Sequence, residues 1–163
     1  MPEASPANAI DLLIHDHRVV EDLFAEFEKA GDRAYKTKQH IVEKFSHELT
    51  VHTYIEEKIF YPEARKSVPA TKDHVLESIE EHHVVVWMLS ELAGLDPKDE
   101  RYDAKVTVLI ENVRHHVEEE EKEWFPQVRK AMKAATLEEL GERLAAAKSK
   151  APSDPLAVPS ATA

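Results

Sequence analysis

Apolar residues recur every three to four positions along four long stretches of this chain, and that is the period of an α-helix. The first stretch begins near Asn8, a residue type that caps helix N-termini, and ends before Gly31. The other three cover about residues 35–65, 72–93 and 102–134. Pro62 lies in the last turns of the second stretch, where it should kink the helix. Four long helices joined by short connections predict an all-α, up-down-up-down four-helix bundle.

Two shorter segments follow the fourth helix. Residues 137–148 predict a short extra helix that packs on the outside of the bundle. The segment APSDPLAVPSATA after it has the composition of a disordered tail. We therefore divide the chain into a bundle at residues 8–134, a short C-terminal helix at 135–150 and a disordered tail at 151–163.

The second and fourth helices contain related motifs, HTYIEEKIFYP from residue 52 and HHVEEEEKEWFP from residue 115. Both motifs have a His-x-x-x-Glu pair followed by an aromatic residue and a proline. The first and third helices also match, because HDHRVVEDLFAEF from residue 15 aligns with EEHHVVVWMLSEL from residue 80. The chain thus consists of two related helical hairpins, and each would contribute half of whatever lies between them. The aligned pairs are Pro62 with Pro126, His52 with His116, Glu56 with Glu120, and His17 with His82.

Four of the ten histidines, His17, His52, His82 and His116, lie in the middle of an apolar stripe, one on each helix. His52 and His116 are each followed four residues later by a glutamate, which a helix brings onto the same face. The core would then hold four imidazoles and two carboxylates, with no lysine or arginine in mid-stripe to pair with them. Because unpaired buried carboxylates are costly, a metal cation is the simplest source of the missing charge.

A single histidine in such a stripe would more often be a core residue bonded to the backbone or to another histidine. Four of them in a repeated frame favour metal binding instead. Imidazole and carboxylate together, in a chain without cysteine, suit iron, manganese or zinc. Six side chains are too many for one tetrahedral zinc and fit a dinuclear centre. Two other metal motifs fail: HELTVH from residue 47 is one residue too long for a zinc-protease site, and the ferritin-like Glu-x-x-His spacing occurs only at Glu80 to His83, off the stripe.

These phrases, with DHR at residues 16–18, resemble the hemerythrin-like, or HHE cation-binding, family over about residues 9–132. The resemblance implies a four-helix bundle around two non-haem iron ions joined by an oxo or hydroxo bridge. It also implies peroxide, oxygen or nitric oxide as the small ligand. The metal ligands that it implies are His17, His52, Glu56, His82, His116 and Glu120.

The sequence departs from the oxygen-carrying hemerythrins in two ways. Their third helix has a His-x-x-x-His pair, whereas Ser78 and Val86 flank His82 here, so the fifth histidine is missing. The last carboxylate, Glu120, comes four residues after its histidine and not five. Tyr54 is a candidate for the open position, but only if a bulge turns it from another helix face; the alternative is a tyrosine at the bundle rim. The remaining carboxylates near the motifs are expected to be solvated or to orient ligand imidazoles, and they are Glu57, Glu119 and Glu121.

Charge and composition limit the partners. A net charge of −11 argues against nucleic acid and anionic membranes, and no apolar stretch approaches the roughly 20 residues that span a bilayer. The N-terminus lacks the pattern of a signal peptide, and the absence of cysteine fits a reducing cytoplasm. We expect a cytoplasmic protein, monomeric or weakly oligomeric, whose partner is a small ligand.

The more open coordination favours catalase-like decomposition of peroxide in oxidative-stress defence, although no separate acid–base residue stands out. The alternatives are an oxygen- or nitric-oxide-binding sensor or an iron store without turnover, or a plain bundle that takes up zinc adventitiously. Whether the chain is an enzyme is left open by the sequence.

Overall fold

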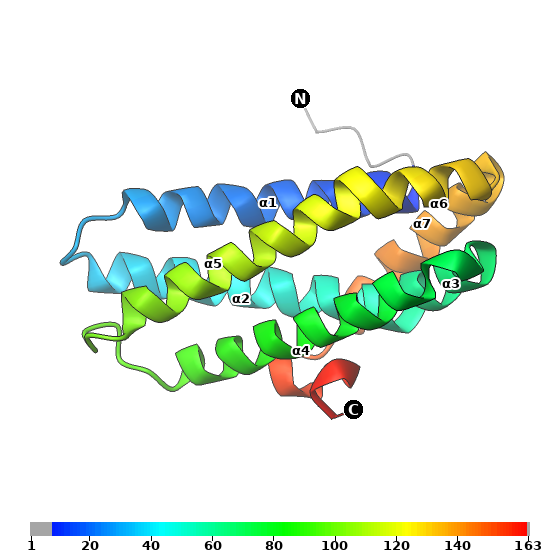
Figure 1. Ribbon diagram of the computed structural model, residues 1–163. Helices are drawn as coiled ribbons and strands as arrows, with labels where there is room; N and C mark the ends of the chain where they lie inside the picture. Colours follow the sequence, from blue (N-terminus) through cyan, green and yellow to red (C-terminus); the bar gives the residue numbers. More distant parts are fainter. Residues whose placement is uncertain (1–7, 163) are drawn as a thin grey trace.

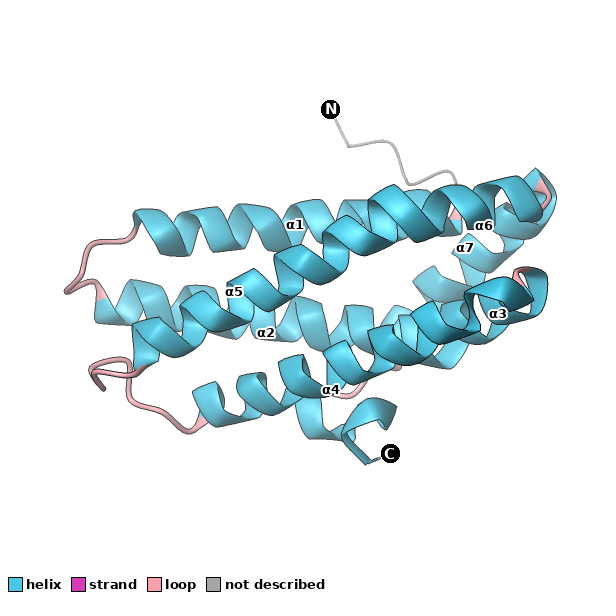
Figure 2. Cartoon of the chain, in the orientation of Figure 1, coloured by secondary structure: helices cyan, strands magenta, loops and turns pink. Residues whose placement is uncertain are grey.

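The computed structural model describes residues 8–162, and Figure 1 shows their long helices lying side by side. The four main rods begin with α1 (Ala9–Lys29), α2 (Tyr35–Ile55), α4 (Lys72–Ala93) and α5 (Tyr102–Glu119). Successive rods run in opposite directions, and no strand occurs among the described residues (Figure 2). The predicted all-α four-helix bundle is confirmed.

The second and fourth rods continue through a wider turn of π-helix. Residues Glu56–Phe60 join α2 to α3 (Tyr61–Ser67), and Glu120–Trp124 join α5 to α6 (Phe125–Ala131). Pro62 and Pro126 lie in the first turns of α3 and α6, and a proline ring clashes with the carbonyl four residues before it. The π turn relieves this clash, because the amide of Tyr61 bonds the carbonyl of Glu56, five residues back. The kink expected at Pro62 thus takes the form of a π turn.

The short C-terminal helix, α7 (Ala134–Lys148), packs beside the start of α1, and its buried face carries Leu137, Leu140 and Leu144. Gly141 permits this close approach, since a Cβ atom there would lie 2.9 Å from the backbone nitrogen of Ala9. The helix begins three residues before its predicted start at Leu137, and its end at Lys148 is as predicted.

The tail differs from the disorder expected for it. Residues 151–162 follow a defined path with two 3₁₀ turns, Pro155–Ala157 and Pro159–Thr162, the first of which packs against α4 (Figure 1). The side chain of Val158 is fully buried, and the amide of Ser160 donates to Glu57 Oε2 at 3.0 Å. Three prolines, Pro152, Pro155 and Pro159, restrict the unfolded chain and so reduce the entropy that ordering costs. Residue 163, which belongs to the same predicted tail, lies outside the described residues.

Two apolar clusters fill the bundle, one toward each end. Along α1, Leu13 belongs to one cluster and Val20 to the other, with His17 between them. The same order holds along the other rods, where His52, His82 and His116 separate residues of the two clusters. Apolar layers above and below therefore shield this polar layer from water.

Candidate metal centre

The four predicted histidines meet in the middle of the bundle. The Nε2 atoms of His17 and His52 lie 3.2 Å apart, and those of His82 and His116 also lie 3.2 Å apart. Each helical hairpin supplies one pair, and all four side chains are buried. The predicted placement of one histidine on each rod therefore brings two imidazole pairs together.

Glu56 and Glu120 lie between the two histidine pairs and are fully buried. Glu56 Oε1 is 2.6 Å from His52 Nε2 and 3.6 Å from His82 Nε2. Glu120 Oε1 is 2.9 Å from His116 Nε2 and 3.4 Å from His17 Nε2. Each glutamate thus reaches one histidine of both hairpins, as a ligand shared between two metal positions would.

Each of the four imidazoles also forms a hydrogen bond with a second carboxylate, through its other ring nitrogen, Nδ1. The pairs are His17 with Glu121 at 2.8 Å, and, each at 3.0 Å, His52 with Asp16, His82 with Glu57, and His116 with Glu81. Carboxylates in this position fix the tautomer and orientation of metal-binding imidazoles. The arrangement is crosswise, because Glu57 and Glu121 each serve a histidine of the other hairpin.

Glu57 and Glu121 thus have the orienting role that the sequence suggested as one alternative, whereas Glu119 lies 3.1 Å from the exposed His115 at the surface. Asp16 and Glu81 were missed. Each directly precedes a histidine of the cluster, and the two align in the repeat of the hairpins. That shared position was the available signal.

The donor atoms fit metal ions. An Nδ1–H that donates to a carboxylate leaves the Nε2 lone pair unprotonated, so two such lone pairs at 3.2 Å repel one another. Both carboxylate oxygens of Glu56, and Oε1 of Glu120, lack a hydrogen bond of acceptable geometry within the described chain. A cation at each histidine pair removes the repulsion and gives these buried oxygens a partner. The overlapping donor groups are His17, His52, Glu56 and Glu120, and Glu56, His82 and His116.

When no metal is bound, protons take the place of the cations. Burial alone would lower the pKa of His52, but the charge of Glu56, the hydrogen bond to Asp16 and the close contact with Glu56 raise it to about 10. Burial, and next the charge of Glu120, raise the pKa of Glu56. Burial would also raise the pKa of Glu120, yet its contacts with His116 and His17 hold it well below the usual range. Metal binding must therefore displace protons from the cluster.

The tyrosine at the cluster is Tyr61 and not Tyr54. The Tyr61 hydroxyl lies 3.1 Å from His82 Nε2 and donates to Glu120 Oε2 at 3.3 Å, whereas Tyr54 packs against the apolar cluster. In a π turn, residues five apart lie on nearly the same face, so Tyr61 follows Glu56 toward the centre. Burial, and next the charge of Glu120, raise the pKa of the Tyr61 hydroxyl well above its usual value.

The two halves of the centre differ at this position. Phe125, the residue that aligns with Tyr61 in the repeat, stacks against His17 with ring centroids 6.0 Å apart and planes 5° apart. The His82–His116 pair therefore has a hydroxyl beside it, and the His17–His52 pair has an aromatic ring. In the sequence, the alignment of Tyr61-Pro62 with Phe125-Pro126 is the signal that could have identified this position.

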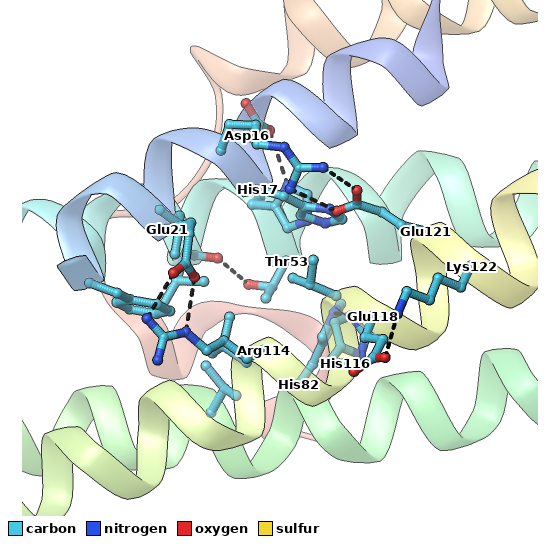
Figure 3. Close-up of a pocket in the computed structure, with 18 residues that line it drawn as sticks. Asp16, His17, Glu21, Thr53, His82, Arg114, His116, Glu118, Glu121 and Lys122 are labelled. Atoms are coloured by element: carbon cyan, nitrogen blue, oxygen red, sulfur yellow. Dashed lines mark hydrogen bonds and ion pairs between the residues drawn. The ribbon is translucent and has the colours of Figure 1, made fainter.

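A cavity of about 410 Å³ leads from the surface between α1 and α5 to the four histidines (Figure 3). Its walls are mainly apolar, and charged side chains from α1 and from α5 with its π turn surround the mouth. The apolar lining residues are Val20, Phe24, Leu49, Val85, Val113 and Val117. A small molecule therefore has a path to the imidazoles.

Comparison with known proteins agrees with this geometry. A profile described as Hemerythrin HHE cation binding domain matches residues 8–128, which include all six predicted ligands. The crystal structure of a hemerythrin HHE cation binding domain-containing protein from Mycobacterium kansasii is similar, with 25% identity, a TM-score of 0.73, and coverage of 88% of this chain and 86% of that one. No curated protein matches the sequence. Within residues 8–162, no helix is long and apolar enough to cross a membrane.

Proposed function

The chain belongs to the hemerythrin HHE cation-binding domain family, and on that premise we propose that it binds two iron ions and decomposes hydrogen peroxide. The ligands that we propose are His17, His52, Glu56, His82, His116 and Glu120. The observation that carries this proposal is the pair of buried glutamates between two histidine pairs, of which both oxygens of Glu56 and Oε1 of Glu120 lack a hydrogen bond of acceptable geometry.

Iron at this centre would supply the two-electron cycle that converts two molecules of hydrogen peroxide into two of water and one of oxygen. The chain's own residues position and protonate the reactants. The cavity admits peroxide to the imidazoles. The Tyr61 hydroxyl holds a proton 3.3 Å from Glu120 Oε2, and it is the neutral acid that the sequence alone did not reveal.

The surroundings of His82 favour catalytic turnover of peroxide rather than reversible binding of oxygen. Its neighbours one turn away, Ser78 and Val86, are buried and provide no imidazole. The group beside the His82–His116 pair is instead the Tyr61 hydroxyl, 3.1 Å from His82 Nε2 and 3.5 Å from His116 Nε2. A centre with fewer fixed ligands exchanges small molecules more readily, which suits an enzyme better than a carrier.

The test is iron content, the near-ultraviolet and visible spectrum, and oxygen release after addition of hydrogen peroxide. We expect two irons per chain and sustained oxygen release. His82→Gln should lose iron and oxygen release together, whereas His83→Gln, at the partly exposed neighbouring position, should retain both. Zinc in place of iron, or His82→Gln with normal iron content, would refute the proposed centre.

Oxygen or nitric oxide binding without turnover is the second candidate. The mainly apolar cavity favours it, because a neutral diatomic molecule loses little hydration on entering such a space. Two irons with a stable oxygen or nitric oxide adduct, and no oxygen release from peroxide, would establish this function in place of the first.

A further inference from the structure

The cavity above the histidines is far larger than hydrogen peroxide or a diatomic gas requires. Its volume is about 410 Å³, whereas a water molecule in the liquid occupies roughly 30 Å³, and an apolar cavity of about 150 Å³ is enough to bind benzene. Two metal ions at the ligand atoms would leave most of this volume free. The space beside the centre therefore has room for an organic group.

The cavity wall is apolar and preformed. Val20, Phe24, Leu49, Val85 and Val113 come from all four rods, are each at most 5% exposed, and belong to one packed cluster. An ordered water needs two to four polar partners, and such a wall offers none. The hydroxyl of Thr53, which also faces the cavity, already donates to the carbonyls of Leu49 and Thr50 (Figure 3). This region consequently favours an apolar occupant.

The mouth carries charged side chains, but its cations are already paired. Arg114 Nη2 donates to Glu21 at 2.7 Å, Arg18 Nη2 donates to Glu121 at 2.5 Å, and Lys122 donates to Glu118 at 2.7 Å (Figure 3). Arg114 also donates to Glu28 at 2.7 Å. Since each cation is neutralised by a carboxylate, the mouth gives no preference to an anionic ligand such as a fatty acid. A neutral molecule is the better fit.

From size, apolar walls, balanced charge and the position of the cluster at its base, we infer that the cavity binds the organic group of a neutral organic hydroperoxide. This inference rests on the proposed function and extends it. The hydroperoxide group lies at the histidines, and hydrogen peroxide is the reductant: ROOH + H₂O₂ → ROH + H₂O + O₂. The O–O bond of ROOH breaks and its oxygens leave in ROH and water, while H₂O₂ gives up two electrons and two protons to become O₂.

The test compares two adjacent valines in the iron-loaded protein. Val85 lines the cavity, whereas Val84 is 50% exposed on the outer face of α4. Val85→Phe should slow consumption of cumene hydroperoxide in the presence of hydrogen peroxide about tenfold, and should slow oxygen release from hydrogen peroxide alone much less, a tenfold loss corresponding to roughly two methylene groups that lose burial. Val84→Phe should change neither rate. Iron content and circular dichroism confirm that both variants fold.

A binding measurement separates this inference from the proposed catalysis. The alcohol product, 2-phenyl-2-propanol, undergoes no redox step, and calorimetry should show that Val85→Phe binds it about tenfold more weakly than wild type. Val85→Ala, which enlarges the cavity, should still bind it. Binding of the alcohol without any oxygen release supports the cavity and refutes the catalysis. Oxygen release with no binding of the alcohol, or with equal binding by wild type and Val85→Phe, overturns the inference.

Discussion

Asp16 connects the centre to the C-terminal helix and offers a quantitative test of the carboxylates that hold the imidazoles. Its Oδ2 accepts from His52 Nδ1 at 3.0 Å, and its Oδ1 accepts from Lys148 Nζ at 2.5 Å. Burial alone would raise the pKa of Asp16, but His52 and Lys148 lower it, so the side chain is a carboxylate at neutral pH. Asp16→Asn keeps the size of the side chain and removes the charge.

An amide has one acceptor oxygen, so asparagine accepts from either His52 or Lys148 and turns its NH₂ group toward the other. Loss of one charge-assisted hydrogen bond should destabilise the protein by about 1.5–3 kcal/mol. Without the carboxylate to fix its tautomer, His52 should also bind metal more weakly. Substitution of such outer partners typically lowers metal affinity about 10–100-fold, which corresponds to roughly 1.4–2.7 kcal/mol.

Chelator competition measures the metal affinity of Asp16→Asn, and urea unfolding of the metal-free protein measures its stability. The matched control is Glu118→Gln, which breaks the exposed pair with Lys122, a kind of contact that water and salt screen and that contributes little to stability. We expect the control to match wild type in both assays. Wild-type affinity in Asp16→Asn would refute the claim that the outer carboxylate prepares His52 for metal.

Two other substitutions and one titration probe the remaining parts of the centre. In the iron-loaded protein we expect Tyr61→Phe to slow oxygen release from hydrogen peroxide and to keep its iron, because it removes the neutral acid beside Glu120, whereas Tyr54→Phe should change neither. A phenolate-to-iron band that Tyr54→Phe abolishes would place Tyr54 at the centre instead. Metal binding should strengthen from about pH 6 to pH 8, because His52, with a pKa of about 10, must lose its proton first. Stability of the metal-free protein should follow the opposite trend, since stabilisation from protonated His52 is complete below pH 6.5 and is lost as the pH rises through about 10. Chelator competition measures the metal affinity across this pH range, and urea unfolding measures the stability of the metal-free protein. A metal affinity that falls, or a stability that rises, with increasing pH would contradict the prediction.

The six clustered side chains that we propose as ligands could be predicted from sequence because two independent signals coincide on them. Each histidine lies where helical periodicity places the core, and the repeat places the same residues in both hairpins. Tyr61 could not be placed by periodicity. A regular helix turns about 140° in the five residues from Glu56 to Tyr61 and would direct that hydroxyl away from the centre. The π turn changes this direction, and it depends on packing around Pro62 as much as on local sequence.

Contacts between distant segments could not be predicted from the sequence for a similar reason. Asp16 and Glu81 each precede a histidine of the cluster in the chain, but only the packing of the adjacent rod shows which imidazole each one contacts. The tail was judged by its average composition, which is typical of disorder. The buried side chain of Val158 and the hydrogen bond from the Ser160 amide to Glu57 Oε2 help to fix its path in the structure, and an average does not register either contact.

The crosswise carboxylates have a consequence for protein engineering. Each hairpin carries a complete histidine pair, yet Glu57 holds His82 and Glu121 holds His17, so neither hairpin orients all its own imidazoles. A chain cut within the 3₁₀ turn Pro69–Thr71 would yield two fragments that each lack the other's orienting carboxylate. Because both apolar clusters contain residues of the two hairpins, the fragments could rejoin through them, and orientation of all four imidazoles would then report that the two halves have met.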